Sequence, residues 1–195
     1  GATLIGLPAA ITLSILAQPI TIVLFYYGKF SWHDVLQTSG ALAILALGVP
    51  AFMIVKVLNS AFYARQDTWT PVRYATYALV VNIIIACLGV RFWQHKSIAL
   101  AIVCSAYTNM FFLLRGLYQK NIFTISMELA RDLGKIHLAC IPLAFSLISG
   151  PSIWQSMLLD KQFLLLVITS AVAWMIYIIT LWCTNIRLTS LFAQK

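Results

Sequence analysis

Phe62-Tyr63-Ala64-Arg65-Gln66-Asp67-Thr68-Trp69-Thr70-Pro71 is a short polar segment between two apolar runs, each long enough to cross a bilayer. Arg65 and Asp67 lie within it and Arg73 just after it, although only 9% of the residues in the chain are charged. Such a polar break predicts a tight connection between two membrane helices at one surface of the bilayer. We call residues 62–71 the elbow.

The second half of the elbow predicts the start of a helix. Thr70 followed by Pro71 is typical of an N-cap and a first helical position, because the threonine oxygen accepts a backbone N–H and proline has none to lose. Asp67 is expected to favour the same helix start through the helix dipole. On this local interpretation, Arg65 and Arg73 only anchor the protein at the headgroups.

The composition predicts an integral membrane protein of the all-α class. Hydrophobic residues make up 62% of the chain, which is more than a soluble domain of this length can bury. A transmembrane helix needs about 20 mostly apolar residues. The stretches that meet this requirement predict a polytopic bundle of six transmembrane helices: Leu4 to Tyr26, Val35 to Phe62, Pro71 to Phe92, Ser97 to Tyr118, Lys135 to Gly150 and Gln162 to Thr184.

The distribution of Lys and Arg predicts the orientation of these helices. Nine of the 13 basic residues fall on the side of the elbow, and the other four fall on the opposite side. The positive-inside rule therefore places the elbow and both termini in the cytoplasm. The net charge of +8 then indicates contact with anionic lipid headgroups rather than with nucleic acid.

The chain begins at Gly1, inside the first predicted membrane helix, with no signal peptide and no initiator methionine. We therefore expect a fragment of a longer protein. The four cysteines, Cys87, Cys104, Cys140 and Cys183, lie in apolar runs without the spacing of metal ligands. We expect buried thiols, with no metal site and no cofactor.

The second predicted helix carries a charge inside the membrane. Lys56 shares a helical face with Asn59 and Tyr63, at steps of three and four residues. Lys56 lies about two turns from the elbow, so its side chain has two alternatives: it extends to the headgroups, or it lines a water-filled cavity. Because ionisable residues inside membranes generally mark pathways, we predict the cavity.

The first predicted helix carries a polar stripe. Ser14, Gln18 and Thr21 are spaced by four and three residues, which places them on one face, and Pro19 predicts a kink beside them. Hydroxyl and amide side chains of this kind either pack helices together or line water. We take Gln18 as a candidate cavity residue.

The third and fourth helices add two more candidate cavity residues. Asn82 lies near the middle of the membrane and predicts an interhelical hydrogen bond. Ser105 and Asn109 share one face of the fourth helix, together with Thr108. A bundle around an aqueous cavity needs such stripes, but so does a bundle that is merely packed through them.

Residues 121–134 are too polar to span the membrane. Apolar residues alternate there with Glu128, Arg131 and Asp132, and Thr124 or Ser126 is placed to cap a short helix on the cytoplasmic surface. We therefore expect a connector over residues 119–134. The sixth predicted helix, apolar on nearly all sides, is expected to face lipid.

Three short runs around the elbow carry a resemblance to a known family. Lys56-Val57-Leu58, the run from Phe62 to Thr68, and Thr70-Pro71-Val72 closely resemble the cytoplasmic elbow in the second half of MurJ/MviN lipid II flippases. These proteins belong to the multidrug/oligosaccharidyl-lipid/polysaccharide exporter superfamily. The segments from Pro8 to Gly28 and from Ser97 to Ala101 support the resemblance.

The resemblance implies a domain organisation. The chain would supply helices nine to fourteen of a fourteen-helix protein, with both termini in the cytoplasm. Residues 1–118 would be part of the C-terminal lobe, residues 119–134 the connector, and residues 135–195 an extra helix pair that contacts the polyprenyl tail. The missing N-terminal lobe of the same protein would be a partner.

The resemblance also implies a function. Family members flip an undecaprenyl-pyrophosphate-linked peptidoglycan precursor across the bacterial inner membrane by alternating access, without covalent chemistry. Lys56, Arg65 and Arg73 are the implied phosphate contacts, with Asn59 beside Lys56, since cationic side chains pair well with phosphates. Three residues of the elbow, Asp67, Thr70 and Pro71, would close or orient it, with Asp67 as the partner of these cations.

Two departures from the family pattern qualify what is implied. The main cavity arginines of the family lie in the first lobe, which this chain lacks. Some members bind sodium with an asparagine and an acid one turn later; Asn82 matches the asparagine, but Ala86 stands in place of the acid. We therefore do not expect sodium coupling.

Other classes of protein remain as alternatives. A drug or polysaccharide exporter of the same superfamily would share the architecture but should lack the elbow motif. A non-transporting structural module would need no charge in the second helix. Catalysis is not expected, because His33, His95 and His137 have no paired carboxylate or nucleophile nearby in the sequence.

Overall fold

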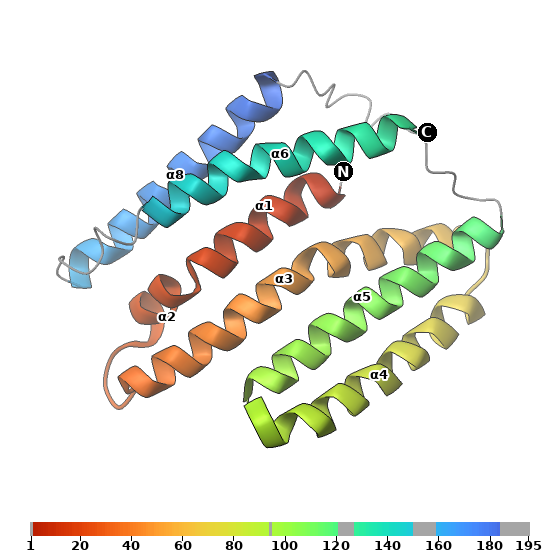
Figure 1. Ribbon diagram of the computed structural model, residues 1–195, viewed down its shortest axis with the longest axis horizontal. Coiled ribbons are helices and arrows are strands. Elements are labelled where there is room, and N and C mark those ends of the chain that lie inside the picture. The colour runs from red at the N-terminus through yellow and green to blue at the C-terminus, as the bar shows by residue number, and fades with distance from the viewer. Residues whose placement is uncertain (1, 94, 121–126, 150–158, 184–195) are drawn as a thin grey trace.

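The computed structural model describes residues 2–93, 95–120, 127–149 and 159–183, and throughout these ranges the regular structure is helical. The all-α prediction is therefore confirmed. Figure 1 shows the helices, whose bounds are α1 (Ala2–Ile15), α2 (Ala17–Phe25), α3 (Trp32–Tyr63), α4 (Trp69–Trp93), α5 (His95–Gln119), α6 (Met127–Ser149) and α8 (Leu159–Cys183).

Each predicted span corresponds to a helix or to a pair of helices. Four helices are long and apolar enough to cross a membrane, namely α3, α4, α5 and α8, and the bent pair of α1 and α2 would make a fifth span. In α6 the apolar part is shorter, from Gly134 to Ile148. The chain is thus a multi-span membrane protein, and its span count of six stays a prediction.

The helix α6 begins inside the segment that we expected to be a separate connector. Its first turns, from Met127 to Gly134, continue directly into the apolar part. The proposed caps Thr124 and Ser126 lie outside the described residues.

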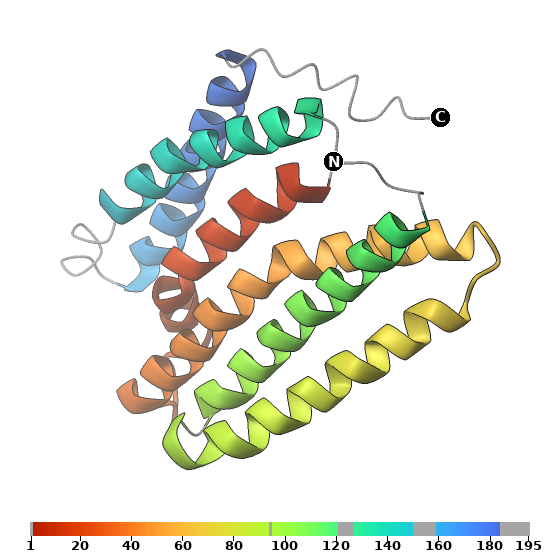
Figure 2. The same ribbon diagram turned by 45° about the vertical axis from the view of Figure 1, so that its right-hand side comes forward.

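The helices follow one another across the molecule in the order α4, α5, α3, α1, α6 and α8 (Figures 1 and 2). The main contacts are between neighbours in this row: α5 packs between α4 and α3, α1 packs between α3 and α6, and α8 packs on α6. Because the row is open, many large apolar side chains are exposed, as expected for surfaces that face lipid or further helices.

The start of α3 is encoded by a capping box. The Ser31 side chain accepts a hydrogen bond from the Asp34 N–H, and the Asp34 carboxylate accepts one from the Ser31 N–H at 2.9 Å. From this start α3 continues for 32 residues to the elbow, a length of about 48 Å. It therefore exceeds the apolar thickness of a bilayer, and its end carries the elbow to the membrane surface.

The predicted kink at Pro19 is displaced toward the N-terminus. The axes of α1 and α2 differ by 64°, and the break lies at Leu16. Proline lacks an N–H and its ring clashes with the carbonyl four residues earlier, so the interruption falls on Ile15 and Leu16 and Pro19 sits in the first turn of α2. The break also separates the predicted stripe: Thr21 is buried, whereas Gln18 is exposed.

A second proline, Pro8, shapes the contact between the first and last helices. Without an N–H at residue 8, the carbonyl of Leu4 has no donor within α1. The hydroxyl of Tyr177 from α8 donates to this carbonyl at 2.7 Å. Tyr177 is 2% exposed and belongs to a buried cluster of α1, α6 and α8: Leu16, Ile136, Ala139, Cys140, Leu143, Leu147, Ala173, Tyr177 and Leu181.

Replacing Tyr177 by Phe tests this contact. Tyr177→Phe keeps the ring but leaves the Leu4 carbonyl without a donor in an apolar surrounding, which is expected to lower the unfolding free energy by about 1–3 kcal/mol. The change is measured as a lower midpoint of thermal unfolding in detergent.

The matched control restores the missing donor. Pro8→Ala places an N–H at residue 8, so Tyr177→Phe should have a clearly smaller effect in a Pro8→Ala background. Equal effects in both backgrounds would show that the tyrosine does not serve the proline-freed carbonyl.

Candidate functional site

The elbow closes the end of α3 with a Schellman motif. The N–H of Asp67 donates to the Phe62 carbonyl at 3.1 Å, and the N–H of Gln66 donates to the Tyr63 carbonyl at 2.9 Å. Gln66 has a φ of 59°, in the left-handed region that such a motif requires. Glycine is the usual residue there, so the elbow holds a glutamine in a strained conformation.

The start of α4 is capped by Asp67 rather than by Thr70, which corrects the sequence-based prediction. The helix begins at Trp69, so that Thr70 and Pro71 lie inside its first turn. The Asp67 carboxylate accepts hydrogen bonds from the Thr70 N–H at 3.1 Å and from the Thr70 hydroxyl at 2.8 Å. A charged acceptor at the positive end of the helix dipole binds these donors better than a hydroxyl does.

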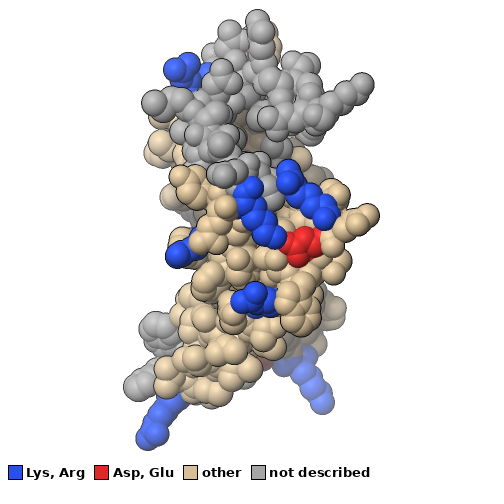
Figure 3. Space-filling view, turned by 90° about the vertical axis from the view of Figure 1, so that its right-hand side faces the viewer, with Lys and Arg blue, Asp and Glu red and all other residues tan. Residues whose placement is uncertain are grey.

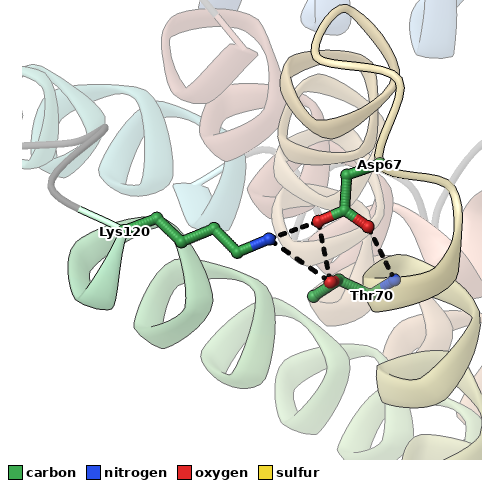
Figure 4. A network of polar contacts seen from close by, with 3 residues as sticks. All are labelled: Asp67, Thr70 and Lys120. Atoms are coloured by element: carbon green, nitrogen blue, oxygen red, sulfur yellow. Dashed lines mark hydrogen bonds and ion pairs between the residues drawn. The ribbon is translucent and has the colours of Figure 1, made fainter.

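The same carboxylate forms an ion pair with Lys120, the residue that follows α5 (Figure 4). The Lys120 ammonium also lies 3.5 Å from the Thr70 hydroxyl and 5.4 Å from the centre of the Phe62 ring. In the sequence, Lys120 is one of the basic residues predicted on the cytoplasmic side. The predicted partners of Asp67 are Lys56, Arg65 and Arg73, but the observed partner is a residue 53 positions away.

These contacts stabilise the ionised form of Asp67. Hydrogen bonding from Lys120 is the largest cause, followed by the backbone and side-chain hydrogen bonds from Thr70, and together they lower the pKa of Asp67 from 3.8 to about 2. At neutral pH the carboxylate is therefore fully charged and holds the ends of three helices.

Close packing of α5 makes this reach possible. A Cβ atom on Gly116 would lie 2.8 Å from the Tyr74 ring and 3.3 Å from the Phe62 ring, so glycine is needed for α5 to approach both neighbours. Phe62 itself is 1% exposed and packs with Leu58, Leu113 and Leu117. The ring beneath Lys120 is thus held in place by the core.

The remaining cations around the elbow are exposed. Lys56, Arg65 and Arg73 all have exposed side chains, and among the described residues none of them forms an ion pair, although Arg73 interacts with the Tyr77 side chain. Figure 3 faces the end of the molecule that carries the elbow and shows several Lys and Arg side chains around one acidic side chain. The acid at the elbow is occupied by Lys120, so these cations are available to an external anion.

A groove lies between α3, α4 and α5, with a volume of about 360 Å³. Asn82 and Asn109 line it, and their role as cavity residues stays a prediction; the Asn82 amide donates to the Ser105 hydroxyl at 3.3 Å. This confirms the predicted interhelical hydrogen bond. The residues that line the groove are Phe52, Val55, Ala75, Ala78, Leu79, Asn82, Ile102, Ser105, Ala106 and Asn109, and Gln18 and Lys56 are not among them.

Two buried amide oxygens have no hydrogen-bond partner among the described residues. They are the side-chain carbonyl oxygens of Asn59, one turn beyond the groove-lining Val55, and of Asn109 in the groove. Buried polar atoms are nearly always paired, so each marks a position where a donor is missing. The described residues contain no cluster of three or more His, Cys, Asp or Glu that could hold a metal ion.

These features define a class of protein: a multi-span helical membrane protein with exposed cations at a rigid elbow and a polar groove between helices. Its residues 2–188 match the family model described as lipid II flippase MurJ. The chain therefore belongs to the MurJ lipid II flippase family, as its elbow motif predicted.

Individual relatives agree with the family model. The chain is 35% identical to a probable lipid II flippase MurJ of Vibrio cholerae, over 78% of this chain and 28% of the relative. It is 30% identical to one of Buchnera aphidicola subsp. Acyrthosiphon pisum, over 98% of this chain and 38% of the relative. This chain thus spans only about a third of the length of these relatives.

A solved structure shares the fold. "Lipid II flippase MurJ, inward closed conformation" superimposes with a TM-score of 0.73 and 24% identity, and the match covers 91% of this chain and 35% of the other. The likeness supports the helix arrangement described above.

Relieving the strain at residue 66 should stabilise the elbow. The left-handed conformation costs a non-glycine residue about 1–2 kcal/mol, and a glycine avoids this cost. Glycine also loses more backbone freedom on folding, which offsets about 0.5–1 kcal/mol of the gain. We expect Gln66→Gly to raise the unfolding free energy by about 0.5–1 kcal/mol, measured by thermal unfolding in detergent. Gln66→Ala, which keeps the strain, should give no such gain.

The capping role of Asp67 should depend on pH. Because its pKa is lower in the folded chain, its contribution is complete above about pH 5 and is lost as the pH falls from about 4 toward 2. The difference in melting temperature between wild type and Asp67→Asn should therefore be constant from pH 7 to 5 and shrink below pH 4. A difference independent of pH down to 2 would contradict the assignment.

Proposed function

We propose that this chain forms part of a flippase that moves a polyprenyl-pyrophosphate-linked peptidoglycan precursor, lipid II, across the bacterial inner membrane. The proposal rests on membership of the MurJ family, together with the exposed cations at the elbow. The elbow and both termini would face the cytoplasm, where the precursor is loaded. The rest of a full-length protein, including its N-terminal lobe, would be the partner that completes the pathway.

The observation that carries the proposal is a set of three exposed cations that have no acidic partner among the described residues. Lys56, Arg65 and Arg73 are exposed near one end of α3 and α4, and the acid between them is bound by Lys120. A pyrophosphate group cannot enter hydrocarbon unshielded, and guanidinium and ammonium groups neutralise it with charge-assisted hydrogen bonds. The elbow would therefore bind the diphosphate of the lipid.

The two buried amide oxygens without a partner support a proposed movement of the helices during transport. Asn59 lies three residues beyond Lys56, and its side-chain oxygen has no donor in this arrangement of the described helices. Alternating access requires the helices around a central cavity to separate and close again. Asn59, and Asn109 in the groove, would gain donors from the sugar and peptide headgroup or from water when the helices separate.

The helix pair α6 and α8 would contact the hydrocarbon tail. Much of its surface is large, apolar and exposed, for example Leu138, Ile141 and Phe145 on α6 and Ile178 and Trp182 on α8. Such a surface favours polyprenyl chains and membrane lipids. The work of the protein would be binding and conformational change, with no covalent step.

The test is complementation with a chimaera. This segment replaces the matching part of a full-length MurJ flippase, and Lys56, Arg65 and Arg73 are changed singly to alanine. A charge-assisted hydrogen bond contributes about 1.5–3 kcal/mol, so each loss should lower lipid II translocation by about tenfold or more. Translocation is measured in cells depleted of their own flippase.

Arg91→Ala provides the matched control, because Arg91 is an exposed cation at the other end of α4. It should retain wild-type translocation. Full activity of all three elbow variants would reduce these cations to headgroup anchors and remove the basis of the proposal.

A further inference from the structure

Lys120 has no role in the function proposed above, yet it makes the ion pair at the centre of the elbow. Its ammonium contacts the Asp67 carboxylate and lies near the Thr70 hydroxyl and over the Phe62 ring. Figure 4 shows the lysine extending from the end of α5 directly toward the carboxylate. The Phe62 side chain beneath the lysine is buried, and the Phe62 backbone carbonyl accepts a hydrogen bond from the Asp67 N–H. Phe62 therefore holds both the aromatic ring and the Asp67 backbone in place.

A free Asp67 carboxylate would compete with an external anion for the neighbouring cations. Arg65 is two residues away, so the two Cα atoms are at most about 7 Å apart, which is within reach of a long guanidinium side chain. Arg73 is only six residues away on the helix that Asp67 caps. A free carboxylate here would pair with an arginine and would also repel an incoming phosphate.

We propose that Lys120 is a positioning residue that sequesters Asp67 and thereby keeps Arg65 and Arg73 free to bind a diphosphate. Lys120 acts through the carboxylate and does not itself touch the anion. The role explains why a cation is supplied from a helix end 53 residues away, although two arginines lie closer in sequence. This inference rests on the proposed function for its ligand, but its mechanism concerns the chain alone.

The first experiment measures anion binding to the full chain in neutral detergent and phosphate-free buffer, with inorganic pyrophosphate as the probe in calorimetry. Lys120→Met should weaken binding by about tenfold, the size of one lost charge-assisted contact. Asp67→Asn and the double variant Lys120→Met/Asp67→Asn should bind within about threefold of wild type, because no carboxylate remains to compete. Lys120→Arg should retain binding.

A matched control separates this role from a general loss of charge. Arg115→Met removes one exposed cation from α5, the helix that Lys120 follows, and should change the affinity much less than Lys120→Met. If the double variant stays as weak as Lys120→Met, the lysine contacts the anion directly and the positioning role is overturned. Unchanged affinity in Lys120→Met overturns it as well.

The second experiment needs no ligand. The effect of Arg65→Gln on the melting temperature should be independent of Asp67 in the wild-type background and should depend on Asp67 once Lys120 is Met. This coupling, seen without any pyrophosphate binding by the wild type, would support the sequestering role and contradict the proposed diphosphate function. Pyrophosphate binding that depends on Arg65 and Arg73, with no such coupling, would support the diphosphate function and contradict the sequestering role.

Discussion

The structure depends on one carboxylate that serves three helices. Asp67 follows the end of α3, caps the first turn of α4 and pairs with the lysine that follows α5. Each contact alone is an ordinary cap or ion pair, but they share one acceptor, so they connect the three helix ends at this point. The elbow is therefore a rigid corner, although it is built from polar residues at a membrane surface, and it fixes where the neighbouring cations emerge.

A second constraint comes from backbone groups in an apolar solvent. A proline inside a membrane helix frees the carbonyl four residues earlier, and a donor from a neighbouring helix can pair with it. Tyr177 of α8 serves the Leu4 carbonyl freed by Pro8. Pro8 thus helps to specify the contact between α1 and α8.

Apolar and charged side chains occupy different parts of the molecular surface. Many exposed side chains are apolar and suit lipid or further helices, whereas several charged side chains gather on the face that carries the elbow. The groove between α3, α4 and α5 is polar through amides and a hydroxyl, those of Asn82, Asn109 and Ser105. A family that moves a charged headgroup past hydrocarbon needs this division, because unpaired charges are tolerable only where water or the ligand reaches them.

The sequence by itself determined the membrane class, the helices, the place of the elbow, the family and the hydrogen bond made by Asn82. These follow from apolar length, from local motifs and from the cost of an unpaired amide in hydrocarbon. Only the tertiary structure decided that Lys120 is the partner of Asp67 and that Tyr177 reaches Leu4. The two pairs are 53 and 173 residues apart, and no local pattern encodes such distances. They exist because packing of α5 on α3, and of α8 on α1, brings a donor to an acceptor that the chain alone leaves unsatisfied.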